Sequence, residues 1–197
     1  MRKRADKRGW AMATGPAAVA RAALVAGLVL GPVAAAYAAG SEDDETKPPP
    51  KTETTTECQD GKVWDSDKKE CVEATKSGFN DDKLFQAARE FAYAGQYENA
   101  IKVLKLARDQ NDPRILNYLG YANRKAGRME LGMSYYRKAL QIDGNYILAR
   151  SYMGQALLEQ GDVQGARVQL VEIRDRGGEN TWAYRSLLQS LGGYRTY

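Results

Sequence analysis

The chain has 197 residues, enough for about one or two domains. Its formal net charge of +4 is unevenly placed, because residues 1–40 carry +5, residues 41–76 carry −5 and residues 77–197 carry +4. Without the first segment the rest sums to −1, which excludes the strongly positive field of a typical nucleic-acid binder. Histidine is absent, so the commonest acid–base group at neutral pH and the commonest metal ligand are missing.

Residues 1–39 have the layout of a secretory signal peptide. A basic start is followed by an uncharged run over residues 22–39, which ends in the small-x-small pattern Ala36-Tyr37-Ala38. We predict cleavage near Ala38 and export to the periplasm of a Gram-negative bacterium. The competing interpretation is an anchor in the inner membrane that faces the periplasm, since eighteen apolar residues sit at the threshold for spanning a bilayer.

Residues 40–56 are acidic, rich in Thr and Pro, and contain no large apolar side chain. Such a composition cannot bury enough surface to offset the entropy lost on ordering. We therefore predict a disordered linker, with Pro48–Pro50 as a short extended spacer.

Residues 57–73 contain the only two cysteines, Cys58 and Cys71. In an exported chain an even pair so close in sequence predicts a disulfide loop. Redox exchange is disfavoured because redox motifs usually place two residues between the cysteines, and metal binding wants more Cys or His ligands. Trp64 has two interpretations, a cover for the disulfide or a small exposed recognition tip, and the sequence leaves both open.

Glycines recur with a spacing of 34 residues in the second half of the chain. Gly127 precedes Gly161 by this spacing and Gly120 precedes Gly154, as do the pairs Ala122 and Ala156, and Leu119 and Met153. This period is typical of stacked helix–turn–helix units. We expect Gly127 to end a helix in a left-handed conformation. We also expect the small residues Gly120 and Gly132 to let two antiparallel helices approach closely.

The pattern resembles the tetratricopeptide repeat family, which favours small and aromatic residues at set positions along 34 residues. The second repeat matches at Leu119, Gly120, Gly127, Tyr136 and Ala139. The third begins near Ile147 and matches at Met153, Gly154, Leu157, Gly161, Ala166 and Leu170. The first is two residues shorter and matches at Ala88, Phe91, Gly95, Tyr97, Ala100, Leu104 and Ala107. Asn123 and Gly144 depart from the usual aromatic and proline.

A final helix is expected from Asn180, which is a good N-cap. Leu188 occupies the position of Gly120 and Gly154 in the repeats, which suits a helix with no partner folded back on it. The resemblance thus implies an all-α fold over residues 80–192: a right-handed solenoid of three helix–turn–helix repeats plus a C-terminal capping helix.

In this family the unpacked faces of the first helices line a concave groove. The resemblance nominates ten partner-binding residues by position: Phe85, Arg89, Arg114, Asn117, Tyr121, Arg124, Ser151, Gln155, Leu158 and Trp182. Arginine pairs with carboxylates, and Tyr and Trp anchor partners at low entropic cost. Part of the clamp by which chaperone-binding members grip a terminal carboxylate is present, so the expected ligand is an acidic or C-terminal peptide. The competing interpretation is a solvated helix face.

No phosphate-binding loop or nucleophile motif is present, so we expect no enzyme, no cofactor and no metal. The leading hypothesis is an exported adaptor that binds a protein or peptide. The alternatives are a structural component that self-associates through Trp182, Tyr194 and Tyr197, and a membrane-anchored form.

Overall fold

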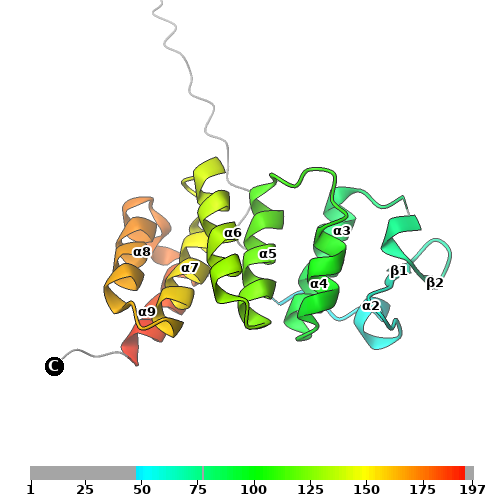
Figure 1. The fold of residues 1–197 in the computed structure, drawn as a ribbon, viewed down its shortest axis with the longest axis horizontal. Coiled ribbons are helices and arrows are strands. Elements are labelled where there is room, and N and C mark those ends of the chain that lie inside the picture. Colours follow the sequence, from blue (N-terminus) through cyan, green and yellow to red (C-terminus); the bar gives the residue numbers. More distant parts are fainter. Residues whose placement is uncertain (1–47, 77, 194–197) are drawn as a thin grey trace, which may run out of the picture. The chain divides into compact units, whose positions relative to one another are not determined.

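The computed structural model describes residues 48–76 and 78–193, so the predicted signal peptide or anchor lies outside the described residues. Within them the chain is mostly helical, as expected, with one two-stranded sheet (Figure 1). The helices are α2 (Glu53–Thr56), α3 (Asp81–Tyr93), α4 (Tyr97–Leu104), α5 (Pro113–Lys125), α6 (Met129–Ile142), α7 (Ile147–Glu159), α8 (Val163–Asp175) and α9 (Trp182–Gly192). Short 3-10 turns occur at Ala74–Lys76 and Gly178–Asn180.

Glycine turns fold α3 onto α4, α5 onto α6 and α7 onto α8. After α5, Gly127 has a φ of +82°, its N–H donates to the carbonyl of Arg124 at 3.0 Å, and the N–H of Arg128 donates to Asn123 at 2.9 Å. Gly95 and Gly161 also have positive φ values. These bonds satisfy carbonyls that the helix end leaves free, in a backbone conformation that favours glycine. The predicted role of Gly127 is confirmed.

Helices α5 and α6 approach closely through two glycines. A Cβ atom on Gly132 would lie 2.8 Å from the carbonyl oxygen of Gly120 and 3.0 Å from the backbone nitrogen of Arg124. A Cβ on Gly120 would lie 2.6 Å from the ring of Tyr136. A side chain on Gly132 would therefore push α5 and α6 apart, and one on Gly120 would displace the buried Tyr136 ring, which confirms the expected reason for small residues there.

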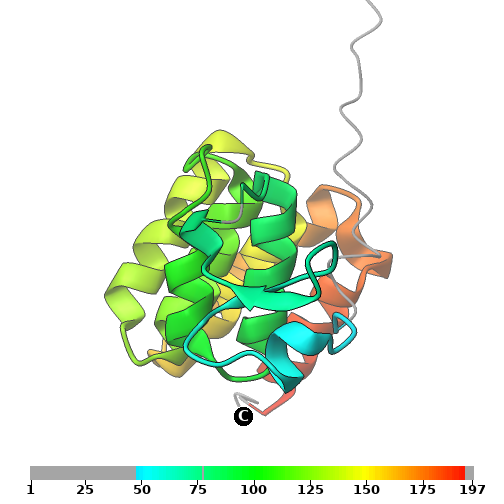
Figure 2. The same cartoon turned by 90° about the vertical axis from the view of Figure 1, so that its right-hand side faces the viewer.

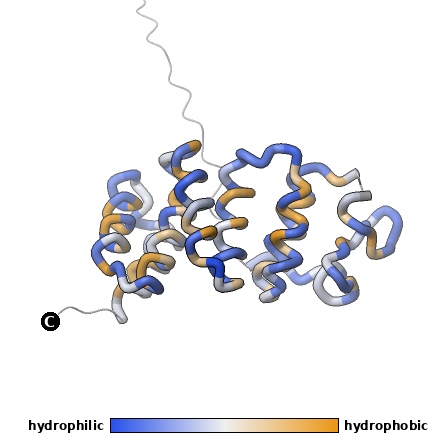
Figure 3. The backbone as a smooth tube through the Cα atoms, viewed as in Figure 1, coloured by the Kyte–Doolittle hydropathy of each residue, from blue (hydrophilic) through white to orange (hydrophobic). Residues whose placement is uncertain are grey.

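Each helix pair packs on the next pair along the chain. Helix α4 contacts α5, and α6 contacts α7; the first helices also contact one another, α3 with α5, α5 with α7 and α7 with α9. Figure 3 shows apolar and polar residues alternating along these helices, whereas the connection before α5 is hydrophilic. The buried apolar residues form three successive clusters, around Phe91, Tyr136 and Leu187.

The predicted disulfide between Cys58 and Cys71 is present. It links the segment after α2 to strand β2 (Glu70–Val72), which pairs antiparallel with β1 (Val63–Asp65). Trp64 stands opposite Cys71 in this hairpin and is half-buried. Figure 2 shows α2 and the hairpin in front of the green helices, and Val63, only 1% exposed, joins the first apolar cluster.

The prediction of a disordered linker through residue 56 is wrong at its C-terminal end. Residues 53–56 form α2, which packs on α3 and buries Thr54. The carboxylate of Glu90 on α3, 6% exposed, accepts hydrogen bonds from the N–H and hydroxyl of Thr52, both at 2.7 Å, and from the hydroxyl of Thr55. Thr52 and Thr55, which the sequence composition predicts to be disordered, are thus held in place by the Glu90 carboxylate, 35–38 residues further along the chain.

The N-cap of the last helix lies one residue after the expected one. Asn180 lies in the 3-10 turn, and Thr181 is the N-cap of α9, since its hydroxyl accepts from the N–H of Tyr184 at 3.2 Å. Among the residues that the structure describes, no helix is both long enough and apolar enough to cross a membrane.

Candidate functional site

The ten nominated residues lie on the first helices of successive pairs and on α9. Helix α3 carries Phe85 and Arg89, and α9 carries Trp182. The remaining seven lie on α5 (Arg114, Asn117, Tyr121 and Arg124) and on α7 (Ser151, Gln155 and Leu158). Because α3, α5, α7 and α9 contact one another in turn, the structure brings most of these residues to the boundaries between neighbouring first helices.

The expectation that all ten line an open groove needs correction, because six are at most 4% exposed: Phe85, Arg89, Asn117, Arg124, Ser151 and Leu158. Arg114, Tyr121 and Gln155 are half-buried, and Trp182 is 37% exposed. The physical reason is that the same helix positions also face the next first helix. In this chain large or hydrogen-bonding side chains fill that boundary.

The boundary between α3 and α5 is built around Tyr118, which is fully buried. The ring of Phe85 meets the ring of Tyr118 edge-on, with centroids 5.3 Å apart. The Nε of Arg89 donates to the Tyr118 hydroxyl at 3.1 Å. Arg114 adds a cation–π contact to this boundary, because its guanidinium lies 5.2 Å from the Phe85 ring centroid. The same guanidinium forms an ion pair with Asp112 at 2.7 Å. The Asp112 hydrogen bond raises the pKa of the Arg114 guanidinium.

Tyrosines continue from this boundary to α7. Tyr152 lies edge-on to Tyr118 at 6.4 Å and packs on Tyr121 at 5.1 Å, and Tyr97 of α4 approaches Tyr121 at 6.3 Å. Burial, with a smaller contribution from neighbouring tyrosines that include Tyr93, raises the pKa of Tyr152 well above its ordinary value. Burial likewise raises the pKa of Tyr121. These hydroxyls therefore stay neutral at physiological pH and act as hydrogen-bonding groups.

Arg124 is a buried cation in this aromatic setting. Its side chain is 1% exposed, its Nη1 pairs with Glu159 at 3.1 Å, and its guanidinium lies 5.7 Å from the Tyr121 ring centroid. Its Nε and Nη2 have no hydrogen-bond partner among the described residues. Burial raises the pKa of the neighbouring Tyr136, and the charge of Arg124 opposes that shift. The positive charge of this buried guanidinium favours a carboxylate on the surface next to it.

The boundary between α7 and α9 is polar at one edge and apolar at the other. The hydroxyl of Ser151 donates to the carbonyl of Ala183 at 2.8 Å, and Gln155 donates to the hydroxyl of Ser186 at 3.1 Å. Leu158 packs in the apolar cluster with Leu187. These three nominated residues thus fix α9 against α7, while Trp182 stands exposed at the first turn of α9.

Sequence reasoning missed five residues of this region: Tyr93, Tyr118, Tyr152, Lys125 and Glu159. A signal was available, because Tyr118 and Tyr152, like Lys125 and Glu159, are separated by 34 residues. We use the name tyrosine face for the partly accessible residues Tyr93, Tyr121, Lys125, Gln155 and Glu159, which are backed by the buried Arg124. Lys125 lies 4.0 Å from Glu159 at this face.

The described residues contain no group of three or more acidic or cysteine side chains that could hold a metal ion. No family model matches the chain, and no curated protein does so either.

Proposed function

We propose that the chain is a tetratricopeptide-type adaptor that binds a protein or peptide partner on the tyrosine face. The proposal rests on the 34-residue spacing, on the close glycine contact between α5 and α6, and on the contacts that link α3, α5, α7 and α9 in sequence. In a three-repeat solenoid with a capping helix, this face would line the concave side. Repeat surfaces of this kind serve protein binding, and the adaptor would be non-enzymatic.

The observation that carries the proposed ligand class is the positive charge of the buried Arg124, whose carboxylate partner Glu159 has a side chain that is 44% exposed. Tyrosine rings supply rigid apolar contact, and guanidinium groups bind carboxylates in two-pronged geometry. Lys125 adds an exposed positive charge next to Arg124. The partner class that fits is a peptide with an acidic or free C-terminal carboxylate, and the predicted export places it in the periplasm.

A binding assay tests this proposal. We expect a fluorescent peptide that ends in Asp-Asp-COOH to bind more tightly than its amidated copy, because the amide removes one carboxylate. Lys125→Glu combined with Tyr93→Ser should abolish binding and leave the helical circular dichroism intact, since both side chains are exposed. Charge reversal at Arg124 is unsuitable because this residue is buried.

The matched control is Lys138→Glu on α6, which reverses the charge of an exposed lysine on a second helix. It should bind like the parent protein. Equal binding by the parent and the Lys125→Glu, Tyr93→Ser double variant would refute the assignment of the tyrosine face.

One observation favours the alternative of a self-associating component, for which the sequence nominated Trp182 together with Tyr194 and Tyr197, two residues that lie outside the described part of the chain. Helix α9 exposes Trp182 at 37% and Leu188 at 48%, and both are large apolar side chains. Light scattering of the purified protein tests this alternative. A dimer that the double variant Trp182→Ser, Leu188→Ser converts to a monomer would support self-association, and a monomeric parent would refute it. The mass of the exported protein separates cleavage near Ala38 from a retained anchor.

A further inference from the structure

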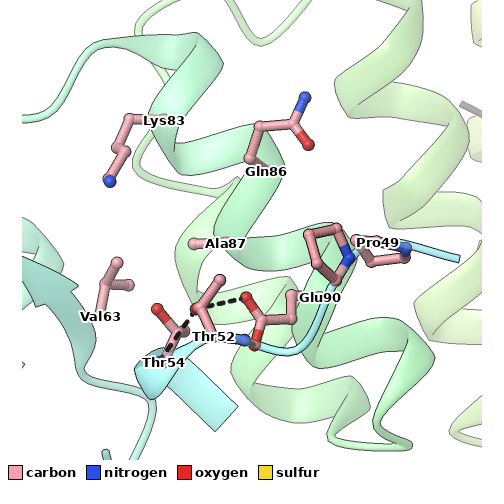
Figure 4. A pocket seen from close by; sticks show the side chains of 9 residues that line it. Pro49, Thr52, Thr54, Val63, Lys83, Gln86, Ala87 and Glu90 are labelled. Atoms are coloured by element: carbon pink, nitrogen blue, oxygen red, sulfur yellow. Dashed lines mark hydrogen bonds between the residues drawn. The ribbon is translucent and has the colours of Figure 1, made fainter. Parts of the chain in front are cut away.

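The chain passes Glu90 of α3 just before α2, in a stretch that we call the strap (residues 48–52). Glu90 fixes the strap by accepting the N–H and the hydroxyl of Thr52. Pro49 and Pro50 line a hollow of about 100 Å³ together with Gln86 and Glu90. Figure 4 shows the strap passing Glu90 and running on past the prolines, away from the hairpin. The residues before Pro48 therefore start from a fixed point beside α3.

That starting point is close to the tyrosine face along the helix. Arg89 and Tyr93 lie one residue before and three residues after Glu90 on α3, and Arg89 bonds to Tyr118 of α5. Neighbouring packed helices have axes about 8–10 Å apart. Seven residues span at most about 25 Å when extended, which exceeds two such helix spacings, so the seven residues before Pro48 are long enough to extend from α3 to α5.

The segment that precedes the strap has the charge that the tyrosine face would accept. Residues 41–46 read Ser-Glu-Asp-Asp-Glu-Thr, with four carboxylates and no basic residue. The face offers the positive charge of Arg124, which is buried beneath it, and the exposed amine of Lys125. The one acidic side chain that pairs with Arg124 among the described residues is Glu159, whose side chain is 44% exposed and so is a partner that water screens.

We propose that the acidic segment 41–46 docks in cis on the tyrosine face and competes there with the external ligand. This inference rests on the proposed function, because it assigns a regulation to the same face. The composition of the acidic segment prevents it from forming a hydrophobic core, but a charged segment can bind a basic site without such a core. A short tether gives an effective concentration on the order of 1 mM. If the free segment binds with a Kd of about 0.1 mM, cis docking weakens the external ligand by about tenfold.

Zero-length carbodiimide cross-linking of the purified protein tests the docking without any ligand. We expect mass spectrometry to find Lys125 linked to residues 42–45 at least about ten times more often than Lys138, which is also exposed and lies on α6. Salt at 0.5 M should reduce this link. The link between Lys125 and Glu159, whose charged atoms lie 4.0 Å apart, is the internal positive control.

The matched variant neutralises the segment through Glu42→Gln, Asp43→Asn, Asp44→Asn and Glu45→Gln. It should bind the Asp-Asp-COOH peptide about tenfold more tightly than the parent. Equal linking of Lys125 and Lys138 would overturn cis docking, even if the peptide binds. If the parent protein links preferentially through Lys125 but the neutralised variant does not bind the peptide, cis docking is supported and the proposed ligand class is refuted.

Discussion

Replacing Gly132 with alanine probes the close contact between α5 and α6. The new Cβ would lie 2.8 Å from the Gly120 carbonyl oxygen and 3.0 Å from the Arg124 backbone nitrogen. Ordinary carbon–oxygen contacts are about 3.3–3.6 Å, so α5 and α6 must separate by roughly 0.5 Å. Both obstacles are backbone atoms, so no side-chain rotation relieves the clash.

Two opposing terms set the size of the effect. Overpacking in a well-packed core costs about 1–3 kcal/mol, whereas alanine in a helix interior is about 1 kcal/mol more favourable than glycine. We therefore expect Gly132→Ala to lower the free energy of unfolding by about 1 kcal/mol. In a domain of this size that loss corresponds to a fall in Tm of about 3 °C.

Gly154→Ala is the matched comparison on α7. Its Cβ would meet the terminal carbons of Leu187 at 2.6 and 2.8 Å, and a leucine side chain can rotate away. We expect this variant to be at least as stable as the parent, because the helix-propensity gain remains. The assay is urea unfolding followed by circular dichroism at 222 nm. A Gly132→Ala protein as stable as the Gly154→Ala protein would refute the reasoning.

Three further predictions concern the N-terminal segment and the tyrosines. The double variant Cys58→Ser, Cys71→Ser should have a free energy of unfolding about 3 kcal/mol lower than the parent, because the disulfide closes a short loop. Amide hydrogen exchange should become faster first in residues 52–72. Unchanged exchange there would contradict the role of the disulfide. Glu90→Gln should cost about 2 kcal/mol in urea unfolding, because charge-assisted bonds to Thr52 and Thr55 are lost, whereas Glu130→Gln on the exposed side of α6 should be neutral. Burial raises the pKa values of Tyr121, Tyr136 and Tyr152, so their contribution to stability is complete below about pH 10 and is lost as the pH rises further. Absorbance at 295 nm should show these three tyrosines ionising only as helicity falls. Ionisation of all twelve tyrosines near pH 10 with helicity retained would disprove the burial of these three.

The helix pairing could be predicted because certain backbone positions require glycine, and these glycines recur at a regular spacing in the sequence. A left-handed φ at Gly127 and the close approach at Gly132 both exclude side chains, whatever lies elsewhere in the chain. Pro113 likewise begins α5, where its missing N–H costs little. Such positions recur with the repeat, so one sequence suffices to find them.

The accessibility of the candidate site could not be predicted in the same way. Whether Phe85 or Ser151 faces solvent depends on what the next first helix presents, here Tyr118 and the carbonyl of Ala183. The position of a residue within its own repeat does not contain that information. The ordering of Thr52 was missed for a related reason, since its acceptor Glu90 lies on another element.

The disulfide hairpin and α2 have a consequence for where further helix pairs could be added. Among the described residues, they cover one side of α3 through hydrogen bonds to Glu90 and through the buried Val63, so that side is not open to another helix pair. The far end carries only a single helix held by Ser151 and Leu187. A duplicated helix pair could therefore be inserted between α8 and α9. Insertion before α3 would instead disrupt the packing of α2 and the disulfide-linked hairpin on α3.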